Sequence, residues 1–152
     1  MEVNEYTLLK NKDDIPFLFL EHQHHTLVQS IKNLDDCVEL LEIFNYSVQY
    51  QENVYLLCLN NCNIVLSASR IAKCTSGCCL FPIKEIIMHA LMSGASCIIV
   101  AHNHPSNGNI STDDIQSTKK LKRACELVDI VLLDSIVLKD KCESIMPYLY
   151  SN

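Results

Sequence analysis

The sequence predicts an α/β protein in which helices flank one mixed β-sheet. Short apolar runs typical of strands alternate along the chain with segments whose apolar residues recur every three to four positions, as in helices. This alternation indicates helices layered on a sheet. A chain of 152 residues fits a single domain, because domains usually hold about 100 to 200 residues. No repeat or low-complexity linker divides it.

The first 30 residues carry the weakest pattern. Residues 16–20 are apolar and predict a short strand, whereas residues 21–26 are polar and histidine-rich and predict a turn. We therefore assign residues 1–30 to an N-terminal appendage packed on a core domain of residues 31–152. The histidines of this appendage are interpreted as surface residues in preference to a metal site: His22, His24 and His25.

The middle of the chain predicts a helix followed by a hairpin. From Asn33, which can cap a helix, apolar residues recur at helical spacing over about three turns. Two apolar runs, 54–59 and 64–67, are then separated by the asparagine-rich segment 60–63. Asparagine favours turns, so the two runs are predicted to pair as a hairpin.

The second half of the chain alternates helices and strands more clearly. Residues 83–91 predict a helix that ends near Gly94, and residues 97–102 predict a buried strand. A further helix is expected over residues 111–128, because a serine that can cap it precedes the apolar pattern. Residues 130–138 form the last clear strand pattern.

Composition narrows the function classes. The formal net charge of −6 and the pI near 5.4 disfavour non-specific binding to a nucleic-acid backbone. No apolar run approaches the roughly 20 residues that span a bilayer, so no membrane partner is expected. The acidic N-terminus lacks the basic-then-apolar order of a signal peptide, which favours a cytoplasmic location.

Nine cysteines are present, an odd number, and most are expected to be reduced thiols. Cys58 and Cys62, together with the cysteines at 74, 78 and 79, could form a structural zinc site. Their spacing is loose, so core or loop thiols are the preferred interpretation. His89 is interpreted as a half-buried residue of its helix.

Residues 102 to 104 read His-Asn-His directly after the predicted strand. Two side chains spaced i, i+2 on a strand point to the same face, so His102 and His104 have the geometry of metal ligands. Ser111 and Asp114 follow at the start of the next helix, where the carboxylate would be held rigidly. Catalytic zinc usually takes three protein ligands and leaves one position open, and His102, His104 and Asp114 supply three. Asp113 is the fallback ligand.

A family resemblance supports this interpretation. The chain resembles the RadC family of the JAB/MPN (JAMM) metalloprotein superfamily in AHNHPS at 101–106, SxxDIxxTKKLKxA at 111–124, ASxII at 95–99 and LLD at 132–134. The likeness covers about two thirds of the chain and weakens towards Asn45. It implies a JAB fold with cytidine-deaminase-like layering, a zinc ion, and chemistry related to enzymes that cleave isopeptide bonds.

The superfamily motif also contains a glutamate that acts as the base. Glu52 precedes an apolar strand as that base does, whereas Glu85 lies in a helix that resembles another family segment. We prefer Glu52 as the base and keep Glu85 as the alternative. In the family pattern Ser111 helps to polarise the substrate carbonyl oxygen. The chain departs from the family in a loop before Ser111 that is one residue shorter, and in Ser135 where a histidine is common.

The leading hypothesis is a Zn²⁺-dependent metallopeptidase or isopeptidase that cleaves a peptide-like amide in a peptide or protein substrate. The rival is a non-catalytic JAB module, a DNA-repair-associated or mobile-element accessory protein that binds DNA or a protein partner. The last predicted helix carries a basic run that favours DNA binding, composed of Lys119, Lys120, Lys122 and Arg123. Charges around a helix nevertheless usually form a solvated face. The sequence leaves a homodimer open and does not identify the substrate, whose contacts we expect in the loops around Gly77 and Pro105.

Overall fold

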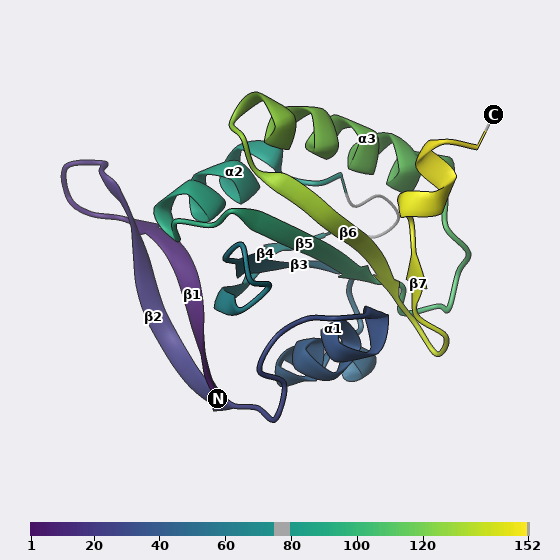
Figure 1. The fold of residues 1–152 in the computed structure, drawn as a ribbon, viewed down its shortest axis with the longest axis horizontal. Helices are drawn as coiled ribbons and strands as arrows, with labels where there is room; N and C mark the ends of the chain where they lie inside the picture. Colours follow the sequence, from purple (N-terminus) through teal and green to yellow (C-terminus); the bar gives the residue numbers. More distant parts are fainter. Residues whose placement is uncertain (75–79, 152) are drawn as a thin grey trace.

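The computed structural model describes residues 1–74 and 80–151. Its centre is one seven-stranded mixed sheet with the strand order β2-β1-β4-β3-β5-β6-β7. The helix α1 lies on one side of this sheet, and α2 and α3 lie on the other (Figure 1). The prediction of a mixed sheet flanked by helices is therefore confirmed.

The strands and helices have the following bounds. The strands are β1 (Glu2–Lys10), β2 (Pro16–His25), β3 (Asn53–Leu59), β4 (Val65–Lys73), β5 (Cys97–Asn103), β6 (Val131–Leu138) and β7 (Glu143–Ser144). The helices are α1 (Leu34–Leu41), α2 (Ile83–Met92) and α3 (Thr112–Leu127), with 3-10 turns η1 (Glu42–Phe44), η2 (Tyr46–Val48) and η3 (Met146–Leu149).

Alternate residues of the central strands enter two separate cores. In β3, Tyr55 and Leu57 pack with α1, whereas Val54 and Leu56 pack in the core that includes residues of α2 and α3. Every residue of β3 and of β5 is buried, so both strands are mainly apolar, with polar residues only at the ends where Asn53 begins β3 and where His102 and Asn103 end β5. We call the side covered by α2 and α3 the upper face, and the side covered by α1 the lower face.

The N-terminal region differs from the prediction. The turn expected at residues 21–26 is wrong, because β2 continues to His25 and pairs along its length with β1, which the sequence did not reveal. β2 is largely exposed, β1 is partly buried, and a register shift occurs between Glu5 and Tyr6, so side chains do not alternate regularly between buried and exposed positions. The hairpin joins the main sheet through the parallel pairing of β1 with β4.

The hairpin predicted for the middle of the chain is confirmed as β3 and β4, although β4 extends to Lys73. The helix predicted from Asn33 begins as expected, with the Asn33 side chain accepting a hydrogen bond from the Asp36 backbone. It is shorter than three turns, because α1 ends at Leu41 and gives way to η1. Gly94 adopts the left-handed conformation (φ 66°) just after α2, as expected for a residue that ends a helix.

No helix in the described ranges combines the length and apolar character needed to cross a bilayer. Gly77, one of the two positions at which substrate contacts were expected, lies outside the described residues, as do the cysteines at 78 and 79.

Candidate metal centre

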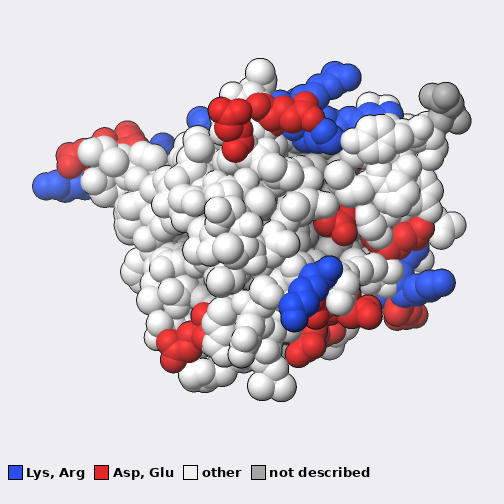
Figure 2. Space-filling model, viewed as in Figure 1, with Lys and Arg blue, Asp and Glu red and all other residues white. Residues whose placement is uncertain are grey.

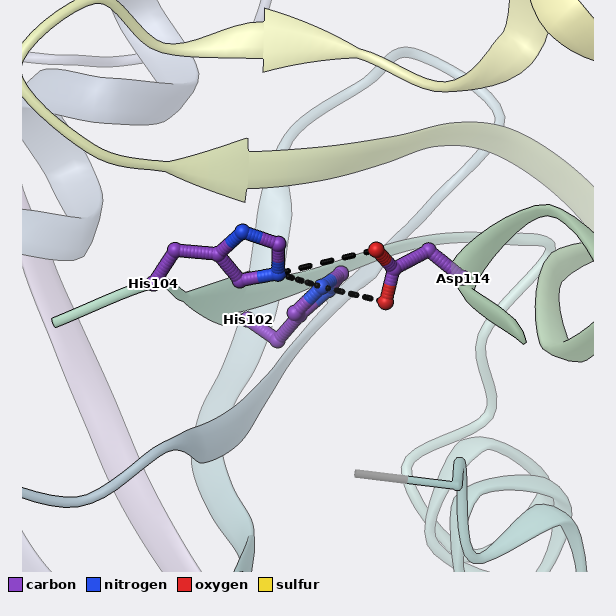
Figure 3. Close-up of side chains that lie close together, drawn as sticks. All are labelled: His102, His104 and Asp114. Atoms are coloured by element: carbon purple, nitrogen blue, oxygen red, sulfur yellow. Dashed lines mark hydrogen bonds and ion pairs between the residues drawn. The ribbon is translucent and has the colours of Figure 1, made fainter. Parts of the chain in front are cut away.

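The three predicted ligands meet at the upper face, where β5 ends and α3 begins. His102 is buried in β5, His104 follows the last residue of that strand, and Asp114 lies in the first turn of α3. Figure 3 shows both imidazole rings directed at the Asp114 carboxylate. One ligand atom from each residue lies within 4.8 Å of the other two.

The distances among these atoms suit a small cation. His102 Nε2 lies 3.0 Å from His104 Nε2 and 3.0 Å from Asp114 Oδ1, and His104 Nε2 lies 3.6 Å from Asp114 Oδ2. Ligands held about 2.0–2.1 Å from zinc in a tetrahedron lie about 3.3 Å from one another. The separations bracket this value, and three protein ligands leave one position for a water or a substrate oxygen.

Ser111 holds the Asp114 carboxylate in place. The backbone and hydroxyl of Ser111 donate hydrogen bonds to Asp114 Oδ2 at 2.7 and 2.8 Å, and Asp114 N donates to Ser111 Oγ at 3.1 Å. This reciprocal capping box starts α3. Burial raises the pKa of Asp114, but the hydrogen bonds to His102 and Ser111 outweigh it and hold the pKa well below its usual range. The carboxylate is therefore a ready anionic ligand.

A backbone contact orients the His104 ring. Its Nδ1 lies 3.0 Å from the carbonyl oxygen of Gly108, which can only accept a hydrogen bond, so Nδ1 carries the proton. In the neutral ring the lone pair is then on Nε2, the atom that faces His102 and Asp114. Hydrogen bonds of this kind from the second ring nitrogen commonly fix metal-binding histidines. The loop after Pro105 thus sets the ligand state of His104.

The His102 ring is enclosed. It meets Phe81 edge to face, with ring centroids 5.6 Å apart, and the side chain is fully buried. Its Nδ1 has no hydrogen-bond partner among the described residues. The polar contacts that the structure gives this ring are therefore those of Nε2 with His104 and Asp114.

Asn103, the residue between the two histidines, has a role that the sequence interpretation missed. It is buried, and its Oδ1 accepts from Asn53 N at 2.8 Å while its Nδ2 donates to Gln51 O at 3.0 Å. These bonds lie on either side of Glu52 and tie its backbone to the His-Asn-His segment. A polar residue at the end of an otherwise apolar buried strand was the signal available in the sequence.

The two candidate bases occupy different environments. Val54 of β3 pairs with His102 of β5, and Glu52 lies two positions before Val54, just before β3 begins. Strand alternation continued to Glu52 would put its side chain on the same face as Val54. Glu52 is partly buried, and its carbonyl oxygen accepts from Cys74 N at 2.8 Å. Glu85 lies exposed in the first turn of α2. The fallback ligand Asp113 is exposed in α3 and is not part of the cluster.

Among residues 1–74 and 80–151, the structure brings together no other group of three or more histidine, cysteine or acidic side chains able to hold a metal. Cys58 is buried in β3 and Cys62 is exposed in the following turn. His22 and His25 are exposed, and His24 is partly buried.

His89 is fully buried and not half-buried as expected, because α2 packs this position against β4. Its Nε2 donates to Ser69 Oγ at 2.8 Å, since the Ser69 hydroxyl itself donates to the Ala68 carbonyl. Burial lowers the pKa of His89 to about 4, so the ring is neutral at pH 7. Both groups are inaccessible to a substrate.

The basic residues of α3 do not form a continuous cationic surface. Lys and Arg side chains over α3 lie beside acidic ones in Figure 2. Lys122 pairs with Glu126 one turn later, and Lys119 is only partly exposed. This mixture is typical of a solvated helix face.

Comparison with protein families adds an independent finding. Residues 31–147 match the family model described as the RadC-like JAB domain. The match contains His102, His104, Ser111 and Asp114, and it begins after the N-terminal hairpin.

Curated bacterial proteins are also similar to this chain. A UPF0758 protein of Staphylococcus haemolyticus is 38% identical over 93 residues, which cover 60% of this chain and 40% of that protein. A UPF0758 protein of Finegoldia magna is 39% identical over 88 residues, covering 57% and 40%. One of Streptococcus pyogenes serotype M49 is 39% identical over 93 residues, covering 60% and 41%. The matched regions span about two fifths of the length of these relatives.

Proposed function

Because the chain belongs to the family of RadC-like JAB domains, we propose that it is a zinc-dependent hydrolase that cleaves a peptide-like amide, as a metallopeptidase or isopeptidase. The observation that carries this proposal is the donor set at the upper face. Two histidine Nε2 atoms and a carboxylate oxygen converge within 4.8 Å, with one of the histidines fixed in the tautomer that ligates through Nε2.

The chemistry of these donors fits zinc. Two imidazoles and one carboxylate form a common set of three ligands for a catalytic zinc site. When bound, zinc lowers the pKa of a water molecule and withdraws electron density from a carbonyl group. His102, His104 and Asp114 would hold the ion, and the hydrogen bonds of Ser111 to Asp114 Oδ2 would keep Oδ1 directed at His102.

Glu52 is the proposed general base. It would accept a proton from the attacking water and return it to the nitrogen of the leaving amine as the C–N bond breaks. The water oxygen thereby becomes part of the new carboxylate, and the amine leaves protonated. Two observations support this role: Glu52 lies two positions before Val54, which pairs with His102, and Asn103 is hydrogen-bonded to the residues on both sides of Glu52. Glu85, by contrast, lies exposed on α2.

Ser111 has two proposed roles. Its hydroxyl positions Asp114, and in the free protein this contact occupies the hydroxyl proton. Rotation of that hydroxyl towards a bound substrate would let it donate to the carbonyl oxygen as negative charge develops there.

A polar hollow of about 270 Å³ lies beside His104, and two of its lining residues, Tyr46 and Leu138, belong to the lower-face core. It is lined by His104, Asn103 and Pro105 on one side and by Tyr46, Ser47, Asn107, Leu138, Lys139 and Asp140 elsewhere. We place part of the peptide or protein substrate in this hollow, which makes polar residues next to the scissile bond the expected preference.

Metal content tests the centre directly. Protein purified with zinc should contain about one zinc ion per chain by elemental mass spectrometry, and His102→Ala, His104→Ala and Asp114→Asn should each lose most of it. The matched control is His25→Ala, which removes an exposed histidine and should retain the metal. Unchanged zinc in the His102→Ala and His104→Ala variants would refute the assigned ligands.

Turnover requires a separate test. The zinc-loaded protein would be incubated with linear peptides and with lysine-branched isopeptides, and new termini would be detected by mass spectrometry. Glu52→Gln should abolish cleavage while zinc content stays unchanged, and Glu85→Gln should retain it. Full turnover in Glu52→Gln combined with loss in Glu85→Gln would reverse the assignment of the base. Absence of cleavage by zinc-loaded wild-type protein across both substrate sets would count against the hydrolase itself.

A further inference from the structure

A large hollow lies at the lower face, away from the proposed metal centre. It has a volume of about 560 Å³ and is lined by Glu5, Thr7, Glu21, His22, His24, Ile43, Phe44, Asn45, Arg70 and Lys73. Arg70 pairs with Tyr55, a lower-face residue, whereas His102 pairs with Val54 on the upper face. The sheet therefore separates this hollow from the predicted zinc ligands.

The N-terminal hairpin creates this hollow. Half of the lining comes from β1 and β2, which precede the region matched by the family model, and half comes from η1, the residue after it, and β4, which lie within that region. A RadC-like domain without the hairpin would lack one wall. The hollow is thus a feature of this chain as a whole.

Arg70 contributes a guanidinium group to the lining of this hollow. Its Nη2 donates to the Phe44 carbonyl at a long 3.4 Å, and its Nε is buried without a partner among the described residues. A guanidinium presents five N–H donors in a planar fork that matches a carboxylate. Lys73 adds a second positive charge at the end of β4.

The part of the lining that comes from β1 and β2 carries negative charge. Glu5 is nearly buried, and its Oε2 lies 2.7 Å from His24 Nε2. Glu21 is exposed at the same hollow. These carboxylates disfavour a doubly charged phosphate and favour a ligand that also carries an ammonium group.

We propose that this hollow binds a small zwitterion, an amino acid or short peptide, with its carboxylate on Arg70 and Lys73 and its ammonium group facing Glu21 and Glu5. This site is independent of the proposed hydrolase activity. The charges of both signs in the lining select the ligand, because a molecule with only one of the two groups leaves either Arg70 and Lys73 or Glu21 without a ligand contact.

Binding can be measured by NMR titration of the full chain at pH 7 with glycylglycine as the probe. We expect saturable shifts of the backbone amides of Thr7, Asn45 and Arg70, with a dissociation constant on the order of 1 mM. Glycinamide, which lacks the carboxylate, and N-acetylglycine, which lacks the ammonium group, should each bind about tenfold more weakly. A further titration with inorganic phosphate tests whether the hollow is a simple anion site.

Variants separate a specific site from general effects. Arg70→Gln should weaken glycylglycine binding about tenfold and Lys73→Gln about threefold, whereas Lys10→Gln, in an exposed ion pair with Asp14, should leave it unchanged. Thermal unfolding checks that each variant folds. Because Lys73 is exposed, Lys73→Gln still tests ligand binding if Arg70→Gln does not fold.

Absence of saturable binding by the wild type, or unchanged binding in both Arg70→Gln and Lys73→Gln, would overturn the proposal. Tighter binding of phosphate than of glycylglycine would overturn the zwitterion assignment. Loss of zinc in His102→Ala with glycylglycine binding retained would confirm that the two sites are independent.

Discussion

Ser111→Ala should destabilise the protein more than loss of an ordinary helix cap. In the structure the hydroxyl accepts a bond from Asp114 N and donates one to Asp114 Oδ2. Loss of a serine cap costs about 1 kcal/mol. A hydrogen bond to a charged group is worth about 1.5–3 kcal/mol, but here the Ser111 backbone still donates to the same oxygen. We therefore expect a total loss of about 2 kcal/mol.

The assay is urea unfolding of the metal-free protein at pH 7 in the presence of a chelator. The matched control is Asn33→Ala, because Asn33 caps α1 through one bond to Asp36 N at 2.9 Å and holds no candidate ligand. This variant should lose about 1 kcal/mol. In thermal unfolding, Ser111→Ala should lower the midpoint by about 4 to 8 °C.

A second readout separates positioning from stability. If Ser111 holds Asp114 for a metal, Ser111→Ala should weaken zinc affinity about tenfold, Asn33→Ala should not change it, and Ser111→Thr should restore both properties. A loss of stability in Ser111→Ala no greater than in Asn33→Ala would refute the argument that the hydroxyl contributes beyond capping.

Three further outcomes follow from other parts of the molecule. Burial lowers the pKa of His89 to about 4, so the stability that the neutral ring contributes is fully present above pH 6.5 and is lost as the pH falls towards 4. In unfolding measured from pH 7 to 4, His89→Gln should remove up to about 3 kcal/mol of this pH dependence. Asn103→Ala leaves the buried Asn53 N–H without its acceptor and should cost about 1–3 kcal/mol in urea unfolding, and a loss below 0.5 kcal/mol, on the order of a surface change, would contradict this. Duplex DNA should show no salt-sensitive binding in fluorescence anisotropy, and the Lys119→Gln, Arg123→Gln double variant should behave as wild type, because the net charge is −6; tight binding that weakens with salt and is lost in the double variant would revive the DNA-binding module.

The parts of the fold that the sequence predicted well are those whose signals are local. Ser111 and Asn33 cap helices through residues three positions away, and Gly94 ends α2 with its own backbone conformation. The pairing of His102 with His104 likewise depends only on the geometry of one strand. These features do not require knowledge of distant contacts.

Other features depend on how distant segments pack. The N-terminal hairpin was missed because β2 is mostly exposed and the register shift after Glu5 interrupts the alternation of β1. Burial of His89 depends on contact with Ser69, which is 20 positions away. The hydrogen bond between Asn103 and Asn53 joins residues 50 positions apart in the sequence, so no local pattern predicts it.

The parallel pairing of β1 with β4 has a practical consequence for anyone who trims this chain to the segment that the family model matches. A fragment that starts at residue 31 would leave the β4 edge uncovered, with Ala68 and Ser69 among the newly exposed backbone groups. Open edges of this kind recruit strands from other molecules and promote aggregation. In the full chain the outer edge belongs instead to β2, whose second half carries glutamate, glutamine and histidine side chains, whereas its first half exposes Phe17, Phe19 and Leu20. The hairpin therefore covers a strand edge that the shortened fragment would expose.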